Sequence, residues 1–595
     1  MGIGRYCCVL ELHLVTYAFH ACMHLPAFQN ALLLFLGGIL CMTFTSFLLS
    51  SFPSRYTKFT CTAATMTQSS SYDPSSLLHL TLENASKGLQ SGRFTSVDLV
   101  EAYLARIEEA SEFNAVLQVN PEAVSVAQHL DEERSRSGPK SPLHGIPILV
   151  KDNIATKDKL DVSAGSYALF GAKPALESSL ISKLRAAGVV ILGKTNLSEW
   201  ANFRGLNISN GWSPRGGQTL GTYYPNSTPA GSSSGSAVAT ALGLCTAAIG
   251  TETWGSILGP AELNNVVGFK PTRGLISTEG VIPVSSRQDV IGTLTRTVKD
   301  AAYLLSEMAG RSERDDRTWH IPFDPIPSFT TFCKGTDLTG ITIGVPRNTW
   351  EGESPAPIQA SFEAALQTLS SAGAIVVENA DFPHVDEFKK LNEQVKGVVR
   401  SSEFKRDIVR YIQTLETNPN NIQSAEDIIG FTKSFPAEEY PDRDIGKFLW
   451  TQAEGVDVDG DKYQEMVKQE LFFGGEGGIL GAMEKYHLDV LVVPADQDIG
   501  NDLAAKMGFP VISVPLGFWP EDTPVQLDKK KPNLVKVAPG MPYSLIFITK
   551  AFSDGILLKV AHAFEQLTAV RETGPLPFKV PETEMRVIQR KEERI

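Results

Sequence analysis

The chain has 595 residues, of which 42% are apolar and 20% are charged. These proportions are typical of a folded globular protein and exclude collagen-like and disordered chains. The net charge of −13 argues against nucleic acid as a partner, because phosphate contacts need clustered lysine and arginine. A chain of this length holds one large domain or two ordinary ones.

Cysteine and histidine usage argues against a metal site or a disulfide framework. Five of the seven cysteines precede Met66, and only Cys245 and Cys333 follow it. The histidines are scattered and form no HExxH or paired-ligand pattern. We therefore expect no metal and no cofactor, and a main body that is suited to a reducing compartment.

The N-terminal part is apolar and allows two interpretations. Residues 31–52 are almost all apolar and long enough to span a bilayer. Arg55 and Lys58 follow them, which would place the rest of the chain on the cytoplasmic side. Alternatively, Met66 begins a polar segment typical of a soluble start, and residues 1–65 are a removed or spurious extension. The chain is then either cytoplasmic or membrane-anchored through residues 31–52 with its main body, residues 66–595, facing the cytoplasm.

The first half of this body alternates between helix and strand patterns. Thr95 or Ser96 can cap a helix, with Asp98 favourable in its first turn, and apolar residues follow at helical spacing. A loop is expected over 135–141, a buried strand over 146–150, a helix over 178–187 and a strand over 189–192. This alternation predicts an α/β fold with a large mixed or parallel sheet, covered by helices on both sides.

The second half supplies more strands and a long helical stretch. Strands are expected over 341–345, 488–493, 509–514 and 542–548, and a last long helix over 555–568. Residues 356–486 are mostly helical and charged in pattern, with a break at 418–421. We expect this segment to cover or narrow a pocket.

A Gly/Ser-rich loop at 228–236 allows three interpretations. As a phosphate loop it lacks the Lys-Ser/Thr ending. As a hydrolase nucleophile elbow around Ser233 it needs a preceding strand, which the prolines before it disfavour. As a structural loop it would use its small residues for close packing.

A second turn, GTETWGS at 250–256, favours catalysis. Ser256 follows a glycine in a tight turn, where several backbone N–H groups can stabilise a developing oxyanion. Lys151 comes directly after a predicted strand, a common position for catalytic residues.

The run 150–272 resembles the amidase signature enzymes. VKDNI carries the lysine, GKTNLSEW and NGWSPRGGQ lie between, and VVGFKPTRGLIS closes the block. Ser232 and Ser256 have the family's separation of 24 positions. The resemblance covers roughly residues 80–570, and the GTET form is most similar to peptide amidases and to bacterial or fungal amidases. It implies the amidase signature fold in a single catalytic domain, with the signature core at 140–310.

The resemblance also implies a mechanism and a substrate class. Ser256 would attack a small carboxylic amide, forming an acyl-enzyme, while Ser232, held by a cis peptide, passes the proton to Lys151. Ser233 would hydrogen-bond the lysine. The oxyanion hole would use the backbone N–H groups of Thr253, Trp254, Gly255 and Ser256. Burial would have to lower the pKa of Lys151 by several units.

Two other functions stay open. The chain is also similar to the A-type polypeptide of glutamine-dependent amidotransferases, which has the same triad and requires partner subunits. A catalytically weak, membrane-anchored binding protein is the other alternative, because Trp254 and Leu258 depart from the family pattern at the turn. Oligomeric state is not indicated by the sequence.

Overall fold

The computed structural model describes residues 76–530 and 532–585, which lie in one compact unit, Ser70–Ile595. The predicted span at 31–52 and the predicted boundary at residue 65 lie outside the described residues. Within the described part, no helix has the length and apolar character needed to cross a membrane.

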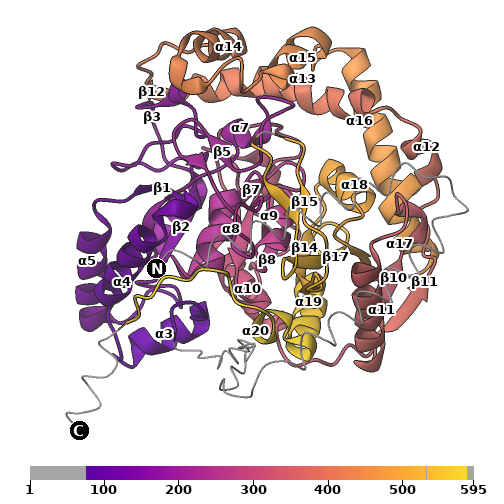
Figure 1. Cartoon of the computed structure of the whole chain (residues 1–595), viewed down its shortest axis with the longest axis horizontal. Helices are drawn as coiled ribbons and strands as arrows, with labels where there is room; N and C mark the ends of the chain where they lie inside the picture. The colour runs from indigo at the N-terminus through magenta and orange to yellow at the C-terminus, as the bar shows by residue number, and fades with distance from the viewer. Residues whose placement is uncertain (1–75, 531, 586–595) are drawn as a thin grey trace, which may run out of the picture. The chain divides into compact units, whose positions relative to one another are not determined.

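An eleven-stranded mixed sheet forms the centre of this unit (Figure 1). Its strand order is β1-β4-β2-β7-β9-β8-β14-β17-β13-β10-β11. Parallel pairs join β4, β2 and β7 towards one edge and β13, β10 and β11 at the other, while the central pairs are antiparallel. The strands are β1 (Val116–Val119), β2 (Pro147–Lys151), β4 (Val190–Thr195), β7 (Ala247–Glu252), β8 (Val267–Lys270), β9 (Val290–Thr295), β10 (Thr342–Val345), β11 (Ile375–Glu378), β13 (Val490–Pro494), β14 (Val511–Phe518) and β17 (Pro542–Ile548).

Helices pack along the sheet in two groups. Helices α8 and α9 contact each other and the central strands, and α10 and α19 form a second contacting pair. The helices of the unit are α3 (Leu82–Gln90), α4 (Ser96–Glu109), α5 (Ala123–Ser137), α6 (Ser179–Ala186), α7 (Glu199–Asn202), α8 (Ser234–Ala241), α9 (Leu258–Leu263), α10 (Val298–Met308), α11 (Ala356–Ser371), α12 (Val385–Lys389), α13 (Glu393–Ile412), α14 (Ala425–Ser434), α15 (Gly446–Glu454), α16 (Asp461–Gly474), α17 (Leu480–Lys485), α18 (Ile499–Met507), α19 (Asp554–Thr568) and α20 (Val570–Thr573). The large mixed sheet with flanking helices in a single domain confirms the predicted α/β fold class.

Local sequence explains where several elements begin and end. Helix α4 starts with a capping box. The Thr95 hydroxyl accepts from the backbone N–H of Asp98, and the Asp98 carboxylate accepts from the backbone N–H of Thr95. Strand β2 is buried along its whole length, as expected of a parallel strand with both faces covered. The predicted loop over 135–141 is partly wrong. Helix α5 continues to Ser137 and ends at Gly138, whose φ of +79° suits glycine.

The predicted helical segment 356–486 has two parts. One part belongs to the central layers of the fold, and the other forms a cover of helices outside them. Helix α11 packs on β14 and α19, and β11 adds an edge strand beside β10, so both belong to the central layers. Helices α12 and α17 pack in an apolar cluster that includes residues of β13, β14 and β17. Figure 1 shows α13, α14 and α15 farther from the sheet, beyond α7. A short ladder between β3 (Lys173–Pro174) and β12 (Leu415–Thr417) joins them to the core. Two further ladders lie outside the main sheet, β5 (Trp212–Ser213) with β6 (Gly217–Gln218) and β15 (Gln526–Leu527) with β16 (Val535–Val537).

A separate apolar cluster binds this cover to the core. Phe404 and Ile408 of α13 are buried with Trp200 and Phe203. The rings of Phe203 and Phe404 lie 4.6 Å apart between centroids, which is within the range for favourable aromatic pairs. The cover therefore packs on the loops that follow β4.

Candidate active site

Three loops bring the predicted residues together at one edge of the sheet. Lys151 ends β2, which runs parallel to β7, so the carboxyl ends of both strands meet at the same edge. Ser232 and Ser233 directly precede helix α8. Ser256 lies in the turn between β7 and α9. The backbone N–H of Ser233 donates to the carbonyl of Ser256 (3.0 Å), which joins the two serine-bearing loops.

The Lys151 amine is fully buried and has three oxygen neighbours. Its Nζ lies 2.8 Å from Ser232 Oγ, 2.9 Å from Ser233 Oγ and 3.1 Å from the Thr251 carbonyl oxygen. The hydroxyl of Ser233 in turn donates to the Thr251 carbonyl (3.0 Å). The peptide bond between Gly231 and Ser232 is cis. The 2.8 Å distance shows that the Ser232 hydroxyl faces the lysine directly.

Burial sets the charge state of this amine. Removal from water lowers the pKa of Lys151 to about 7, while the nearby carboxyl groups of Glu252 and Asp289 act in the opposite direction. A lysine that loses its proton near neutral pH is able to serve as a general base.

The turn that carries Ser256 presents unused backbone donors. Gly255 has a φ of +69°, a left-handed conformation in which a side chain would be strained. Within the described part of the chain, none of the backbone N–H groups at 253–256 donates a hydrogen bond to another protein group. These are the four groups that the sequence analysis assigned to an oxyanion hole, and they remain available to a ligand.

Glu252 holds the residues that follow Ser256 in the turn. The sequence did not predict this contact. One carboxylate oxygen accepts from the backbone N–H groups of Ile257 (2.7 Å) and Leu258 (3.1 Å). Glu252 is buried, and its position directly before the turn is the signal that would have identified it. Backbone donors therefore satisfy one oxygen of this acid, while its other oxygen, Oε1, is buried without a hydrogen-bond partner among the described residues.

Asp289 is a second residue that sequence reasoning missed. It accepts a hydrogen bond from the Thr253 hydroxyl (2.5 Å) and from the backbone N–H groups of Val284 and Ser285. Burial raises the pKa of Asp289 to about 6. Only the pairing of β9 with β7 brings it to the turn, so no local pattern marks it.

The two residues that depart from the family pattern, Trp254 and Leu258, lie in different environments. Trp254 is 41% exposed, and Leu258 is buried in an apolar cluster. A cavity of about 630 Å³ contains Ser256, Gly231, Trp254 and Leu258 in its lining. A volume of this size suits a small organic substrate. Trp254 therefore forms part of the pocket wall.

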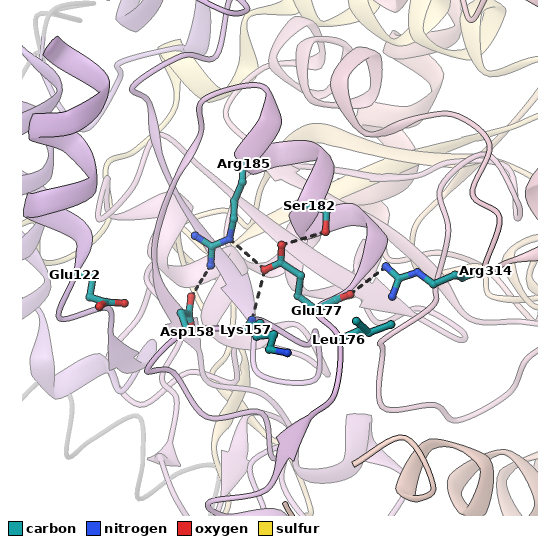
Figure 2. A pocket seen from close by; sticks show the side chains of 8 residues that line it. All are labelled: Glu122, Lys157, Asp158, Leu176, Glu177, Ser182, Arg185 and Arg314. Atoms are coloured by element: carbon teal, nitrogen blue, oxygen red, sulfur yellow. Dashed lines mark hydrogen bonds and ion pairs between the residues drawn. The ribbon is translucent and has the colours of Figure 1, made fainter. Parts of the chain in front are cut away.

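A larger cavity, of about 720 Å³, lies elsewhere and has charges that are already paired. Figure 2 shows Arg185 held between Asp158 (2.6 Å) and Glu177 (3.2 Å), with Ser182 donating to Glu177. Its lining includes neither the buried lysine nor the loop serines. We therefore assign the chemistry to the smaller cavity. Within the described residues, no cluster of three or more His, Cys, Asp or Glu side chains is arranged to hold a metal ion.

Comparisons with known proteins show which family the chain resembles over most of its length. A family model described as Amidase matches residues 98–558. A relative in Arthroderma benhamiae that is named as an amidase is 41% identical over 518 residues, covering 83% of this chain and 86% of the relative. The solved peptide amidase of Stenotrophomonas maltophilia is 34% identical, with a TM-score of 0.73, covering 85% of this chain and 98% of that one. The A-type polypeptide of the glutamyl-tRNA(Gln) amidotransferase of Chloroflexus aurantiacus is 30% identical, covering 83% of this chain and 97% of that protein.

Proposed function

The chain belongs to the amidase family, hydrolases that act on amide C–N bonds, and on that premise we propose that it cleaves a small carboxylic amide through Ser256. The products are a carboxylate and ammonia or an amine. The observation that carries this proposal is the fully buried Lys151 amine, 2.8 Å from Ser232 on a loop that contacts Ser256.

The hydrogen bonds around Lys151 define how the base works. A neutral amine has two N–H donors and one lone pair. Ser233 uses its hydroxyl proton on the Thr251 carbonyl, so its oxygen accepts from Lys151. The second N–H of the lysine reaches the Thr251 carbonyl. The lone pair is then left for the hydroxyl proton of Ser232, which is the direction that proton transfer requires.

The reaction then proceeds in two steps, acylation of Ser256 and hydrolysis of the acyl-enzyme. Ser256 Oγ attacks the amide carbon as its proton passes to Ser232, whose own proton passes to Lys151. The tetrahedral oxyanion forms beside the backbone N–H groups of residues 253–256, and one such donor contributes about 3 kcal/mol. Lys151 returns its proton through Ser232 to the amide nitrogen, and the C–N bond breaks. Water repeats the sequence on the acyl-enzyme and restores Ser256.

Glu252 and Asp289 position the turn without entering the reaction. The Glu252 carboxylate holds the amides after Ser256, and Asp289 holds the Thr253 hydroxyl. With those contacts made, the amides before Ser256 keep a fixed orientation towards the substrate. Preorganised donors of this kind avoid reorganisation during the reaction.

The test is amide turnover by the full chain and by Ser256→Ala. We expect ammonia release from a panel of aliphatic, aryl and peptide amides, and its loss in the variant. Lys151→Met is expected to lose turnover in the same way while the protein stays folded. Equal turnover in wild type and Ser256→Ala would contradict the proposal.

Two outcomes would favour the other functions. An amidotransferase component would co-purify with partner subunits and hydrolyse glutamine for them. A binding protein would show neither turnover nor labelling of Ser256 by a fluorophosphonate. The amidase function is favoured, because the relative named as an amidase is 41% identical and the amidotransferase polypeptide is 30% identical.

A further inference from the structure

The cavity that contains Ser256 has an acidic wall. Glu262, on α9, Asp496 and Asp498, in the loop before α18, all line it. Two lysines, Lys530 and Lys536, line the same cavity. Within the described residues, neither lysine forms an ion pair with these three carboxyl groups, although the charge of Lys536 acts on Glu262 and Asp498 to lower their pKa values. The negative charge of the wall is therefore not neutralised by direct contact.

Within the described part of the chain, two of these carboxyl groups make no side-chain hydrogen bond or ion pair that would stabilise the fold. Asp498 is the N-cap residue of α18, yet its side chain makes no capping hydrogen bond. Glu262 makes no side-chain hydrogen bond or ion pair among the described contacts. Asp496 differs, since it accepts from the Ser354 hydroxyl (3.1 Å) and the Gln497 amide (3.3 Å). Asp498 and Glu262 are thus the groups left for a ligand.

An independent observation also points to a ligand that donates hydrogen bonds. Asn501 lines the same cavity and is only 3% exposed, and its Oδ1 atom has no hydrogen-bond partner. A buried acceptor without a partner costs about 1–3 kcal/mol, so such atoms are usually satisfied when the site is filled. A Cβ at Gly255 would lie 3.9 Å from Asn501 Nδ2, which places Asn501 beside the proposed oxyanion turn.

The surroundings of the wall suit a cation. Trp254 and Asp498 line both this cavity and an adjoining one of about 200 Å³, whose lining has the acids Glu351 and Asp502 and the cations Lys396 and Arg400. An aromatic face beside carboxylates is a common environment for ammonium and guanidinium groups. Burial, followed by the neighbouring Asp502, raises the pKa of Asp498 to about 6, as expected where like charges crowd together. Burial and the neighbouring Asp498 raise the pKa of Glu262 to about 8, so at neutral pH the negative charge lies mainly on Asp498.

We propose that this wall makes the protein select amide substrates that carry a positively charged ammonium or guanidinium group. Asp498 supplies the negative charge, the Glu262 carboxyl oxygens accept hydrogen bonds from the cation, and Asn501 Oδ1 accepts a further hydrogen bond from the substrate. This inference rests on the proposed function, because the selected molecule is the amide that Ser256 attacks.

The test compares three amides that differ in one side-chain charge: N-acetyl-lysinamide, N-acetyl-norleucinamide and the α-amide of N-acetyl-glutamate. The readout is the ratio of kcat/KM values for the lysine and norleucine amides. We expect a ratio above about five in the wild type, equivalent to one modest ion pair, and weak or no turnover of the glutamate amide. The double variant Asp498→Asn/Glu262→Gln is expected to bring the ratio close to one.

Two further variants separate this effect from general charge. Lys536→Gln removes a competing cation of the pocket and is expected to increase the ratio. Glu484→Gln removes an exposed acid of α17 outside the cavity and is expected to leave the ratio unchanged. A wild-type ratio at or below one would overturn the proposal. A ratio that survives in the double variant would overturn it as well.

A third readout distinguishes failure of this inference from failure of the proposed function. Fluorophosphonate labelling of Ser256 is measured with each amide as competitor. If no amide is hydrolysed but Ser256 is labelled, stronger protection by the lysine amide supports the charge selection, and equal protection overturns it. If Ser256 is neither labelled nor needed for turnover, the proposed function fails, and this inference fails with it.

Discussion

Lys151 is the residue on which the proposed chemistry depends most. It is fully buried, and burial lowers its pKa to about 7 against the opposing effect of Glu252 and Asp289. Two other buried lysines, Lys194 and Lys270, have pKa values lowered by burial to about 8. Only Lys151 faces the hydroxyl groups of the Gly/Ser loop, so position rather than burial distinguishes it.

We predict that kcat/KM rises with pH and levels off above a midpoint near 7. The neutral amine is the active form, and a pKa of about 7 means that it is mostly protonated below that pH and mostly neutral above it. A pH profile with a neutral, non-titrating amide substrate measures this directly. An acid limb that lies near pH 10, the ordinary range of lysine, would contradict the assignment.

A second prediction concerns Glu252, which acts through the turn and through Lys151. Glu252→Gln loses the charge on its hydrogen bonds to Ile257 and Leu258, and such bonds are worth about 1.5–3 kcal/mol. We expect kcat to fall by about tenfold or more. Because Glu252 raises the pKa of Lys151, the acid limb is also expected to shift to lower pH.

The shift of the limb separates this role from simple loss of structure. A damaged fold would lower kcat without moving the midpoint of the pH profile. Glu484→Gln, which removes an exposed acid, is the matched control and is expected to change neither quantity. A profile for Glu252→Gln that is lower but unshifted would contradict the electrostatic part of this account.

At the scale of elements, the cover helices are held to the core by a buried ionic cluster. Arg204 donates to Glu199 (2.6 Å) and to Glu438 (2.9 Å), and all three side chains are at most 1% exposed. Arg204 also donates to the backbone carbonyls of Glu438 and Arg443. Residues more than two hundred positions apart are thereby joined at one point.

We predict that Arg204→Met lowers the free energy of unfolding by about 3–5 kcal/mol, because it leaves two buried carboxyl groups without their cation. Urea unfolding measures the change. The matched control is Arg311→Met, which breaks an exposed ion pair with Asp324 (3.0 Å) and is expected to cost about 0–1 kcal/mol. Similar decreases in the free energy of unfolding for both variants would contradict a stabilising role specific to the buried cluster.

Sequence patterns predicted the strands and helices with strong local signals. The buried run at β2, the start of α4 near Thr95 and the spacing of the two serine loops all depend on residues close together in the chain. Strand β11 was missed because it is a short, partly exposed edge strand between two helices. A pattern of that length does not separate an edge strand from a helix linker.

Contacts between distant residues explain most of what the sequence did not predict at the site. The motif residues Lys151 and Ser232 were expected to meet, and they lie 2.8 Å apart. Asp289 reaches Thr253 only through the antiparallel pairing of β9 with β7. The acidic wall combines α9 with the loop before α18, two segments that are more than two hundred residues apart.

At the scale of the whole molecule, every residue assigned to the chemistry or to the acidic wall lies within one compact unit that starts at Ser70. We predict that a chain starting at Ser70 has the same kcat/KM as the full chain. Steady-state kinetics on both proteins measure this. A loss of turnover with retained folding would contradict it and would assign residues 1–69 a part in the site. Co-sedimentation of both chains with lipid vesicles separates an anchor at 31–52 from a removable extension.

The central claim is that Ser256 carries the acyl group during turnover. The most direct measurement is mass spectrometry of the protein quenched during turnover of an amide that is hydrolysed, with peptide mapping of the adduct. This account predicts an added mass equal to the acyl group on Ser256 in the wild type and none in Ser256→Ala. An acyl group mapped to Ser232 or Ser233, or turnover that proceeds in Ser256→Ala, would contradict it.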